Sequence, residues 1–334
     1  MILVTGGTGL LGSNLLLTLS KQDETIRAIY RDSNQIEKIS RLFQQLDPES
    51  GKRLFSKIEW RKCDILDVIE LQEVMKGCRL VYHCAALVSY RRRDFGRMMK
   101  VNGQGTANVV NIALDEKVER LCYVSSTAAV GKEKKQDNYF VEETNKWTQD
   151  KRTSGYAISK YTAEKEVWRA MEEGLSGIII NPSVIFGPGN WNESSLTIFR
   201  TLSKGLRFYT TGANAFVDVR DVVRAMQLLA ESEISGQRYL CTGTNISFLD
   251  LFKEITKQLK VRTPNIKAGK WLSGIAWRLD SLFALFTRKQ TLTKESVSSA
   301  QAKVIYNSSK LEKAFEFEFT PLIETIDYSI KGKN

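Results

Sequence analysis

The sequence predicts an α/β fold with a doubly wound parallel sheet and a smaller, mixed lobe on the C-terminal side. Short apolar runs alternate with longer stretches whose apolar residues recur every three or four positions. This is typical of parallel strands joined by helices that cover both faces of a sheet. A glycine-rich turn follows the first run, and the alternation becomes irregular after residue 182. At roughly 150 residues per domain, the 334 residues suffice for two domains or for one large α/β domain with an elaborated end.

Six predicted strands occupy the first half of the chain. Each ends in a polar or glycine-bearing turn, and most are followed by a helical pattern, such as the face formed by Leu11, Leu15 and Leu19. Later helices are expected over Asp221–Ala230 and Phe248–Leu259, with Asp221 as the cap of the first. The strands are expected at Ile2–Thr5, Ile26–Tyr30, Ile58–Cys63, Leu80–Cys84, Leu121–Ser125 and Gly177–Asn181, with a later one at Arg238–Cys241.

Composition excludes several classes of protein. The chain is 42% hydrophobic and 26% charged, with 5 Pro and 22 Gly, which is ordinary for a globular protein and not for a disordered or collagen-like one. The net charge of +11 is compatible with an anionic ligand but identifies none. Because no nucleic-acid reading motif accompanies the basic residues, we expect no nucleic-acid partner.

Cysteine and histidine usage limits the chemistry further. The five cysteines form no CxxC pair, and the chain has one histidine, so neither a metal site nor a histidine-based triad is expected. Scattered, unpaired cysteines in apolar surroundings are typical of reduced thiols in a cytoplasmic protein. The longest apolar stretch, Trp271 to Phe286, contains Arg278 and Asp280 and is shorter than the ~20 residues of a membrane span. We therefore predict a cytoplasmic protein without a transmembrane segment.

The turn after the first strand reads Thr5-Gly6-Gly7-Thr8-Gly9-Leu10-Leu11-Gly12. Gly6 would permit a tight turn off the strand, Gly9 would let backbone N–H groups approach a pyrophosphate, and Gly12 would let helix and strand pack closely. The following helix N-terminus would face the anion with its unpaired N–H groups. The strand–loop–helix context therefore predicts a dinucleotide-binding site.

A second motif, Tyr156-Ala157-Ile158-Ser159-Lys160, spaces a phenol and an amine by one helical turn. The ordinary pKa of a tyrosine, ~10, is too high for acid–base work near neutrality. A neighbouring ammonium and an oxidised nicotinamide favour the phenolate and lower that pKa. Tyr156 could then exchange a proton with a substrate oxygen.

With the G-x-x-G-x-x-G spacing of residues 6–12, the chain resembles the extended branch of the short-chain dehydrogenase/reductase superfamily, also described as NAD-dependent epimerases and dehydratases. The resemblance runs from Thr5 to about Thr325 and is closest to dihydroflavonol reductases and 3β-hydroxysteroid dehydrogenases. It implies a Rossmann-type dinucleotide-binding domain over residues 1–182, with returning segments at about 215–243. Residues 183–334 would form mainly the substrate-binding lobe.

The resemblance also implies the cofactor contacts. Asp64 and Ile65 match the contact to adenine, and Pro182, Ser183 and Val184 match the segment beside the nicotinamide. Relatives more often carry arginine where this chain has Asn181, and Asn102 would brace the strand ends. The expected cofactor-binding residues are Thr5, Gly6, Thr8, Gly9, Leu10, Leu11, Gly12, Arg31, Asp64, Ile65, Cys84, Ala85, Ala86, Tyr156, Lys160, Pro182, Ser183 and Val184.

The end of the second strand bears on the choice of dinucleotide. It reads Tyr30-Arg31-Asp32, with no acid at the strand end. An acid there would hold the ribose 2′-OH of NAD, whereas a guanidinium suits the 2′-phosphate of NADP. We therefore favour NADP(H) over NAD(H). The alternatives are that Arg31 stacks on adenine or faces solvent, and that Asp32 acts as the ribose acid.

A hydroxyl at the end of the fifth strand completes the catalytic set implied by the resemblance. Alignment through Gly131 gives this place to Ser126, with Thr127 as the alternative. The catalytic residues are thus expected to be Ser126, Tyr156 and Lys160.

Departures from the family's sequence patterns reduce the number of reactions that this chain is expected to catalyse. Dehydratases carry an Asp-Glu pair after the catalytic hydroxyl, but Thr127 and Ala128 stand there. Nucleotide-sugar enzymes carry Arg-Asp-Phe where this chain has Asn214-Ala215-Phe216. We therefore predict an NAD(P)-dependent oxidoreductase that moves a hydride between the cofactor and a carbonyl or secondary alcohol. An NAD-dependent nucleotide-sugar epimerase and a non-catalytic NAD(P)-binding sensor are the alternatives.

Two further features have two interpretations each, and a third has one. The apolar face within Trp271–Phe286 indicates core packing or a lid over an apolar substrate. The cluster Arg91-Arg92-Arg93 faces solvent or binds an anionic substrate tail, and residues 132–153 form a long surface loop typical of lids. His83 is expected to pack and hydrogen-bond, not to catalyse. The resemblance adds a homodimer as an alternative to a monomer.

Overall fold

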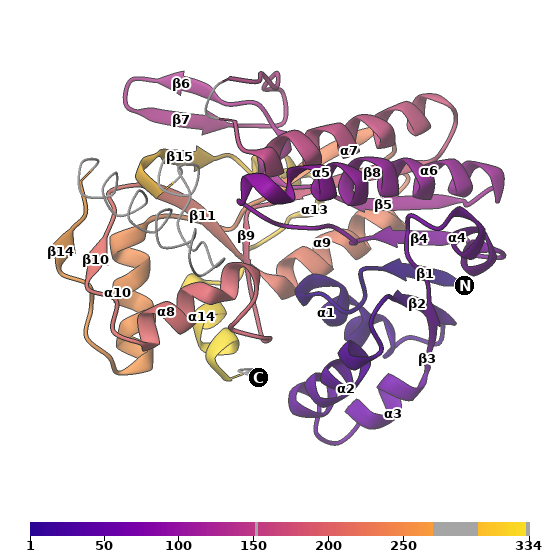
Figure 1. Ribbon diagram of the computed structural model, residues 1–334, viewed down its shortest axis with the longest axis horizontal. Helices are drawn as coiled ribbons and strands as arrows, with labels where there is room; N and C mark the ends of the chain where they lie inside the picture. Colours follow the sequence, from indigo (N-terminus) through magenta and orange to yellow (C-terminus); the bar gives the residue numbers. More distant parts are fainter. Residues whose placement is uncertain (151–152, 270–299, 332–334) are drawn as a thin grey trace.

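The computed structural model describes residues 1–150, 153–269 and 300–331. Its main sheet is parallel throughout, with strand order β12-β8-β5-β4-β1-β2-β3 (Figure 1). The chain runs outward from β1 in both directions, as in a doubly wound Rossmann-type sheet. The strands are β1 Ile2–Thr5, β2 Ile26–Tyr30, β3 Ile58–Lys62, β4 Leu80–His83, β5 Arg120–Val124, β8 Gly177–Pro182 and β12 Gln237–Cys241.

Helices cover both faces of this sheet, because its strands are apolar on both sides. Val4 packs into the core on one face and Leu3 into the core on the other. One core is covered by α1 (Leu10–Leu19), α2 (Asn34–Leu46), α3 (Gly51–Ser56) and α9 (Val219–Glu231). The other is covered by α4 (Val68–Met75), α6 (Gly105–Asp115) and α7 (Gly155–Glu172), with the short α5 (Phe95–Met98) packed on α7. The predicted fold class is confirmed.

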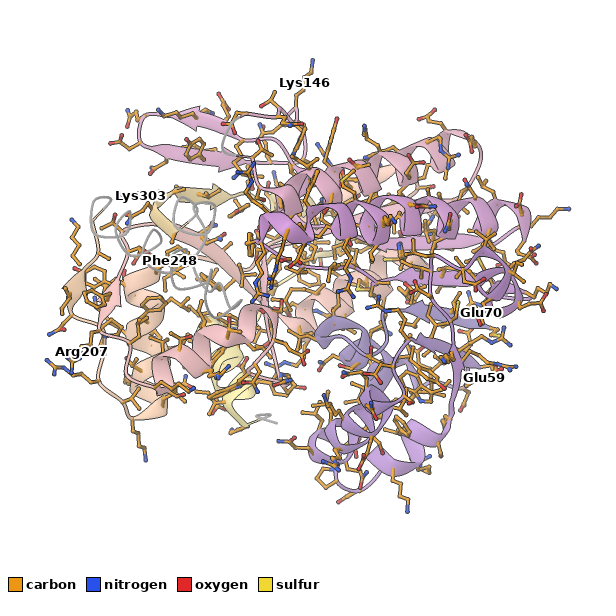
Figure 2. The ribbon with its side chains drawn as sticks, in the orientation of Figure 1. Glu59, Glu70, Lys146, Arg207, Phe248 and Lys303 are labelled. Carbon is orange, nitrogen blue, oxygen red and sulfur yellow. The ribbon has the colours of Figure 1, made fainter. Side chains whose placement is uncertain are left out.

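A second, mixed sheet forms the other end of the molecule. Its order is β13-β11-β15-β7-β6, and β9 pairs with β11. Figure 2 shows Lys303 and Phe248 at this end and Glu59 and Glu70 at the opposite end, beside the first sheet. The strands are β6 Glu133–Lys135, β7 Asn138–Val141, β9 Val184–Phe186, β11 Ala213–Asp218, β13 Thr244–Ser247 and β15 Lys303–Tyr306.

Within the described part of the second lobe, three helices surround an aromatic core that includes Phe186, Phe199 and Phe216. A small parallel pair lies beside them, formed by β10 (Phe208–Tyr209) and β14 (Ile266–Lys267). The helices are α8 Thr197–Ser203, α10 Phe248–Leu259 and α14 Leu322–Lys331, and α13 Ser309–Phe315 packs against β12.

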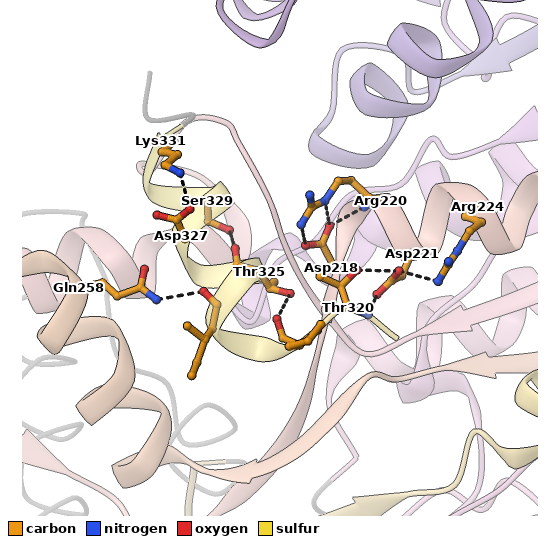
Figure 3. Close-up of polar contacts among 12 residues, drawn as sticks. Asp218, Arg220, Asp221, Arg224, Gln258, Thr320, Thr325, Asp327, Ser329 and Lys331 are labelled. Carbon is orange, nitrogen blue, oxygen red and sulfur yellow. Dashed lines mark hydrogen bonds and ion pairs between the residues drawn. The ribbon is translucent and has the colours of Figure 1, made fainter. Parts of the chain in front are cut away.

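Two sequence-based expectations are corrected here. Residues 132–153 are not one long loop, because β6 and β7 form a hairpin and β7 pairs with β15 in parallel. The cap of α9 is Asp218, whose Oδ1 accepts from the Arg220 N–H at 2.8 Å, and not Asp221. Asp221 instead accepts from the backbone N–H of Thr320 at 2.7 Å, which fixes the C-terminal segment to α9 (Figure 3).

The stretch Trp271–Phe286 lies outside the described residues. Among the helices that the structure does describe, none has the length and apolarity needed to cross a bilayer. The described residues also contain no group of three or more His, Cys, Asp or Glu placed to hold a metal ion.

Candidate active site

The glycine loop lies between the end of β1 and the start of α1 at the centre of the sheet. Gly6 has a φ of +69°, and a Cβ on it would lie 2.6 Å from the backbone nitrogen of Ala85. A Cβ on Gly12 would lie 2.2 Å from the carbonyl oxygen of Gly6. The chain can therefore pass this close to β4 and to α1 only without side chains at these positions.

The start of α1 suits an anion. Its cap is Gly9, which is exposed, and within the described α1 the first turn carries neither a capping side chain nor an acid. The N–H groups of this turn therefore remain available to a diphosphate, and the helix dipole favours negative charge there. Thr8 and Leu10 lie partly exposed on either side of Gly9.

Two predicted contact residues of the loop have buried side chains. Leu11 packs in the core beneath α1. The Thr5 hydroxyl lies 2.7 Å from His83 Nδ1 and accepts from the Ala85 N–H at 3.2 Å, while His83 Nε2 lies 3.0 Å from the Thr106 hydroxyl. Burial lowers the pKa of His83 to about 3, so the imidazole is neutral and structural, as expected from its apolar neighbours.

The end of β2 presents one cation. Arg31 is exposed and makes no ion pair with any other described residue. The neighbouring Asp32 is turned toward α2, because its Oδ1 accepts from the Asn34 N–H at 3.0 Å.

The other predicted contacts of the adenosine side lie along the carboxyl ends of β3 and β4. Asp64 is partly exposed, and its Oδ1 accepts from the Leu66 N–H at 3.0 Å. Ile65 is buried, and its side chain packs so closely on Gly105 that a Cβ added to Gly105 would collide with it. Cys84 and Ala85 follow β4 beside Gly6, and burial raises the pKa of Cys84 to about 12. Ala86, the next residue, is exposed.

Tyr156 and Lys160 lie in the first two turns of α7, which begins beside the ends of β4 and β5. Ser154 caps this helix by accepting from the Ala157 N–H at 3.1 Å. Lys160 is 1% exposed and donates to the Tyr123 hydroxyl and the Val124 carbonyl oxygen, both at 2.8 Å. Burial lowers its pKa to about 7, although Glu164 acts in the opposite direction.

The two candidate hydroxyls after β5 have different partners. Burial and the neighbouring Tyr90 raise the pKa of Tyr156, and the Ser126 side chain opposes the rise. Burial raises the pKa of Tyr306 to about 12, and there the Thr127 side chain opposes the rise. The structure thus brings Ser126 to Tyr156 and directs Thr127 toward the second lobe.

Two tyrosines that the motifs did not indicate border this site. The rings of Tyr90 and Tyr156 are 6.1 Å apart, and Tyr90 also acts electrostatically on Tyr306. Tyr90 follows β4, whereas Tyr306 ends β15 in the second sheet. No sequence spacing relates them, because only the pairing of β15 with β7 and β11 brings Tyr306 here.

The remaining predicted residues lie at the end of β8 and beside it. Pro182 ends the strand, the Ser183 hydroxyl donates to the Thr242 carbonyl at 2.8 Å, and Val184 begins β9. The described residues leave one side-chain oxygen here buried without a partner, Asn181 Oδ1. A polar group of a bound nucleotide could satisfy it.

Asn102 braces the site as expected. Its side chain accepts from the Leu87 N–H at 2.7 Å and donates to the Ser159 hydroxyl at 2.9 Å, which ties the segment after β4 to α7. It lies in a π-helical turn, Met99–Gln104, a feature frequent at functional sites.

Comparisons with known proteins agree with this geometry. A family model described as the NAD dependent epimerase/dehydratase family matches residues 2–241. Cinnamoyl-CoA reductase 1 of Petunia hybrida is 29% identical over 91% of this chain and 92% of its own length. Anthocyanidin reductase of Arabidopsis thaliana is 30% identical over 73% and 76%. The solved structure of gox2253 is 26% identical, with a TM-score of 0.80 over 99% of this chain and 97% of its own.

Proposed function

The chain belongs to the NAD dependent epimerase/dehydratase family, and from this premise we propose that Ser126, Tyr156 and Lys160 are the catalytic residues of an NADP(H)-dependent carbonyl reductase. The chain is an NAD(P)-dependent oxidoreductase of the extended short-chain type, as its resemblance to reductases of that family predicted. The observation that carries the proposal is that Ser126 acts on the Tyr156 phenol from the end of β5, with the Lys160 amine one turn further along α7.

In the proposed mechanism, Ser126 and Tyr156 together hold the carbonyl oxygen of the substrate. Burial keeps the pKa of Tyr156 high, so the phenol is protonated at neutral pH and is ready to donate. When bound, the nicotinamide supplies the hydride. As negative charge develops on the oxygen, Tyr156 transfers its proton to it, and the Lys160 ammonium stabilises the phenolate that forms.

The residues around the loop fit a dinucleotide. The exposed start of α1 would bind the diphosphate, and Asp64 and Ile65 would border the adenine. The side chains that follow β4 are small, so the cofactor could lie close to the backbone there. These residues are Cys84, Ala85 and Ala86. A preference for NADP(H) is supported by the exposed Arg31 and by Asp32, whose carboxylate already accepts from the Asn34 N–H. We propose that the Arg31 guanidinium binds the 2′-phosphate of NADP(H) through two parallel hydrogen bonds.

The proposed substrate is an apolar carbonyl compound. Two relatives are named as reductases of cinnamoyl-CoA and of an anthocyanidin. In this chain the aromatic ring of Tyr90 lies beside Tyr156, and Tyr90 also acts electrostatically on Tyr306. A nucleotide-sugar substrate is less well supported, because the uncharged Asn214 and the buried Ala215 stand where a diphosphate clamp would be needed.

A substrate screen tests this function directly. The purified protein is mixed with NADPH or NADH and a panel of apolar ketones, aldehydes, UDP-sugars and GDP-sugars, and the nicotinamide absorbance is followed. Oxidation of NADPH by a carbonyl compound supports the proposal. Tightly retained NAD with interconversion of sugar epimers would instead identify an epimerase, and cofactor binding without any turnover would identify a sensor.

We further propose a cytoplasmic location, since all five cysteines are free and four are buried. A homodimer is proposed only as an alternative to the monomer, and sedimentation would separate the two.

A further inference from the structure

A buried carboxylate lies one helical turn beyond Lys160 and has no part in the mechanism above. Glu164 is 1% exposed. It accepts hydrogen bonds from Ser125 Oγ at 2.6 Å, Asn181 Nδ2 at 2.8 Å, Arg238 Nη1 at 3.0 Å and Trp168 Nε1 at 3.3 Å. A carboxylate is costly to bury unless it is paired and hydrogen-bonded, so this side chain is held by a fully formed set of donors.

Two of these donors belong to the strand ends that carry the catalytic hydroxyl. Ser125 directly precedes Ser126, and its backbone N–H donates to the Ile180 carbonyl at 2.8 Å. The amide of Asn181 that donates to Glu164 also donates to the backbone carbonyl of Ser126 at 3.0 Å. Glu164 therefore ties the end of β5 to the end of β8, immediately beside Ser126.

The positive partner of Glu164 comes from a neighbouring strand. Asn181 stands where relatives more often carry an arginine, and it cannot neutralise a carboxylate. Arg238 of β12 does so instead, and β12 pairs with β8 so that Arg238 lies opposite Ile179. Its Nε also donates to the carbonyl of Glu143 at 3.0 Å. The ion pair thus also anchors the segment that follows β7.

Glu164 is also the negative group that acts on Lys160. The other titratable groups around the Lys160 amine are Tyr123 from β5, His83 and Cys84 at the end of β4, and Tyr156 on α7. Burial raises the pKa of Tyr123, Cys84 and Tyr156 and lowers that of His83, so all four are neutral near pH 7. Among the groups that oppose the loss of the Lys160 proton, Glu164 acts more strongly than Cys84.

We propose that Glu164 is a positioning residue of this active site, which fixes Ser126 through Ser125 and Asn181 and supplies the negative charge that acts on Lys160. This inference rests on the proposed function and deepens it. A structural role alone would require only that the ion pair with Arg238 be intact, whereas the positioning role requires the carboxylate itself.

The test compares Glu164→Gln with Arg238→Gln in the full chain, because both break the same ion pair and only the first removes the negative charge. For Glu164→Gln we expect kcat to fall roughly tenfold or more with little change in KM, since the oxygen-binding hydroxyl is displaced. The pH at which turnover is lost on the alkaline side should fall by about one unit, because the Lys160 proton is lost more easily. Arg238→Gln should leave that pH unchanged or slightly higher.

Equal losses in both variants with an unchanged pH profile would overturn the proposal and leave Glu164 a purely structural residue. Wild-type kcat in Glu164→Gln would overturn it as well. If Glu164→Gln does not fold, the double variant Glu164→Gln/Arg238→Gln leaves no unpaired buried charge. Its alkaline limit should then lie below that of Arg238→Gln, and an equal limit would contradict the proposal. Full turnover in Tyr156→Phe would signal failure of the proposed function instead.

Discussion

Lys160 donates a hydrogen bond at 2.8 Å to the backbone carbonyl of Val124, two residues before Ser126. The second turn of α7 is therefore fastened to the end of β5, where the proposed catalytic hydroxyl begins. The same amine donates to Tyr123 and lies 4.5 Å from the centre of its ring. One buried amine thus links the two elements that have to hold a substrate oxygen between them.

We expect replacement of this amine to stabilise the cofactor-free protein at low pH. The pKa of Lys160 is about 7 in the folded state against a usual 10.5. Between these two values the unfolded chain binds a proton that the folded chain does not, so the free energy of unfolding of the wild type rises with pH. The free energy of unfolding of Lys160→Met should exceed that of the wild type by on the order of a few kcal/mol at pH 6. This difference should shrink toward pH 10.

Denaturant unfolding at pH 6 and pH 9 measures this difference. The matched control is Lys165→Met, because Lys165 lies on the same helix and is exposed. A pH-independent difference between Lys160→Met and the wild type would contradict the assignment of a buried amine whose pKa is lowered by burial.

The glycine loop predicts a second effect on stability. Gly6→Ala should lower the free energy of unfolding by more than 2 kcal/mol, since the new Cβ meets backbone atoms of Cys84 and Ala85 and the φ is positive. Gly77→Ala is the control, because its φ of +71° is similar but no atom lies within 4 Å of the added Cβ. If Gly77→Ala lowered the free energy of unfolding as much as Gly6→Ala, the close approach of Gly6 to the segment after β4 would contribute nothing to the effect.

Most of the first sheet could be predicted from the sequence, because buried parallel strands consist of short apolar runs bounded by glycine or polar turns. Ile2–Thr5 and Ile26–Tyr30 form β1 and β2 with unchanged bounds. The hairpin of β6 and β7 escaped prediction because Glu133–Lys135 is entirely exposed and charged, so no apolar alternation marks it. Asp221 was misassigned as a cap because its partner, Thr320, is 99 residues away.

In the site, local motifs were predictable and long-range contacts were not. Gly6, Gly9 and Gly12 follow one another at three-residue spacing through the turn that leads into α1. Tyr156 and Lys160 lie one helical turn apart in the sequence. Glu164 continues the same spacing, so the four-residue period of α7 could have indicated it, but its partner Arg238 comes from a distant strand. Tyr306 gave no signal, since its place depends on pairing within the second sheet.

Cofactor preference depends on Arg31 if its guanidinium binds the 2′-phosphate. Arg31→Ala should weaken NADPH binding by roughly tenfold or more, because a charge-assisted hydrogen bond is worth about 1.5–3 kcal/mol, and NADH binding should change little. Fluorescence titration of both cofactors measures this, with the exposed Arg53→Ala on α3 as control. Equal weakening of both cofactors would refute the role in selectivity.

The two hydroxyls after β5 should differ sharply in their effect on turnover. Ser126→Ala should lower kcat by about 10²-fold, the usual effect of losing one donor to a developing oxyanion. Thr127→Ser keeps the hydroxyl beside Tyr306 and should stay within a few-fold of wild type. Steady-state kinetics on one carbonyl substrate separates the two, and the reverse order would make Thr127 the catalytic hydroxyl.

The most direct measurement of the central claim is the turnover of Tyr156→Phe with saturating NADPH and a carbonyl substrate, alongside cofactor binding in the same preparation. The control is Tyr161→Phe, because Tyr161 lies on the same helix as Tyr156 and its ring stacks on Trp147; this variant should retain wild-type turnover. We predict that Tyr156→Phe loses at least ~10²-fold in kcat and binds NADPH normally. Wild-type turnover in Tyr156→Phe would contradict the assignment of this phenol as the proton donor.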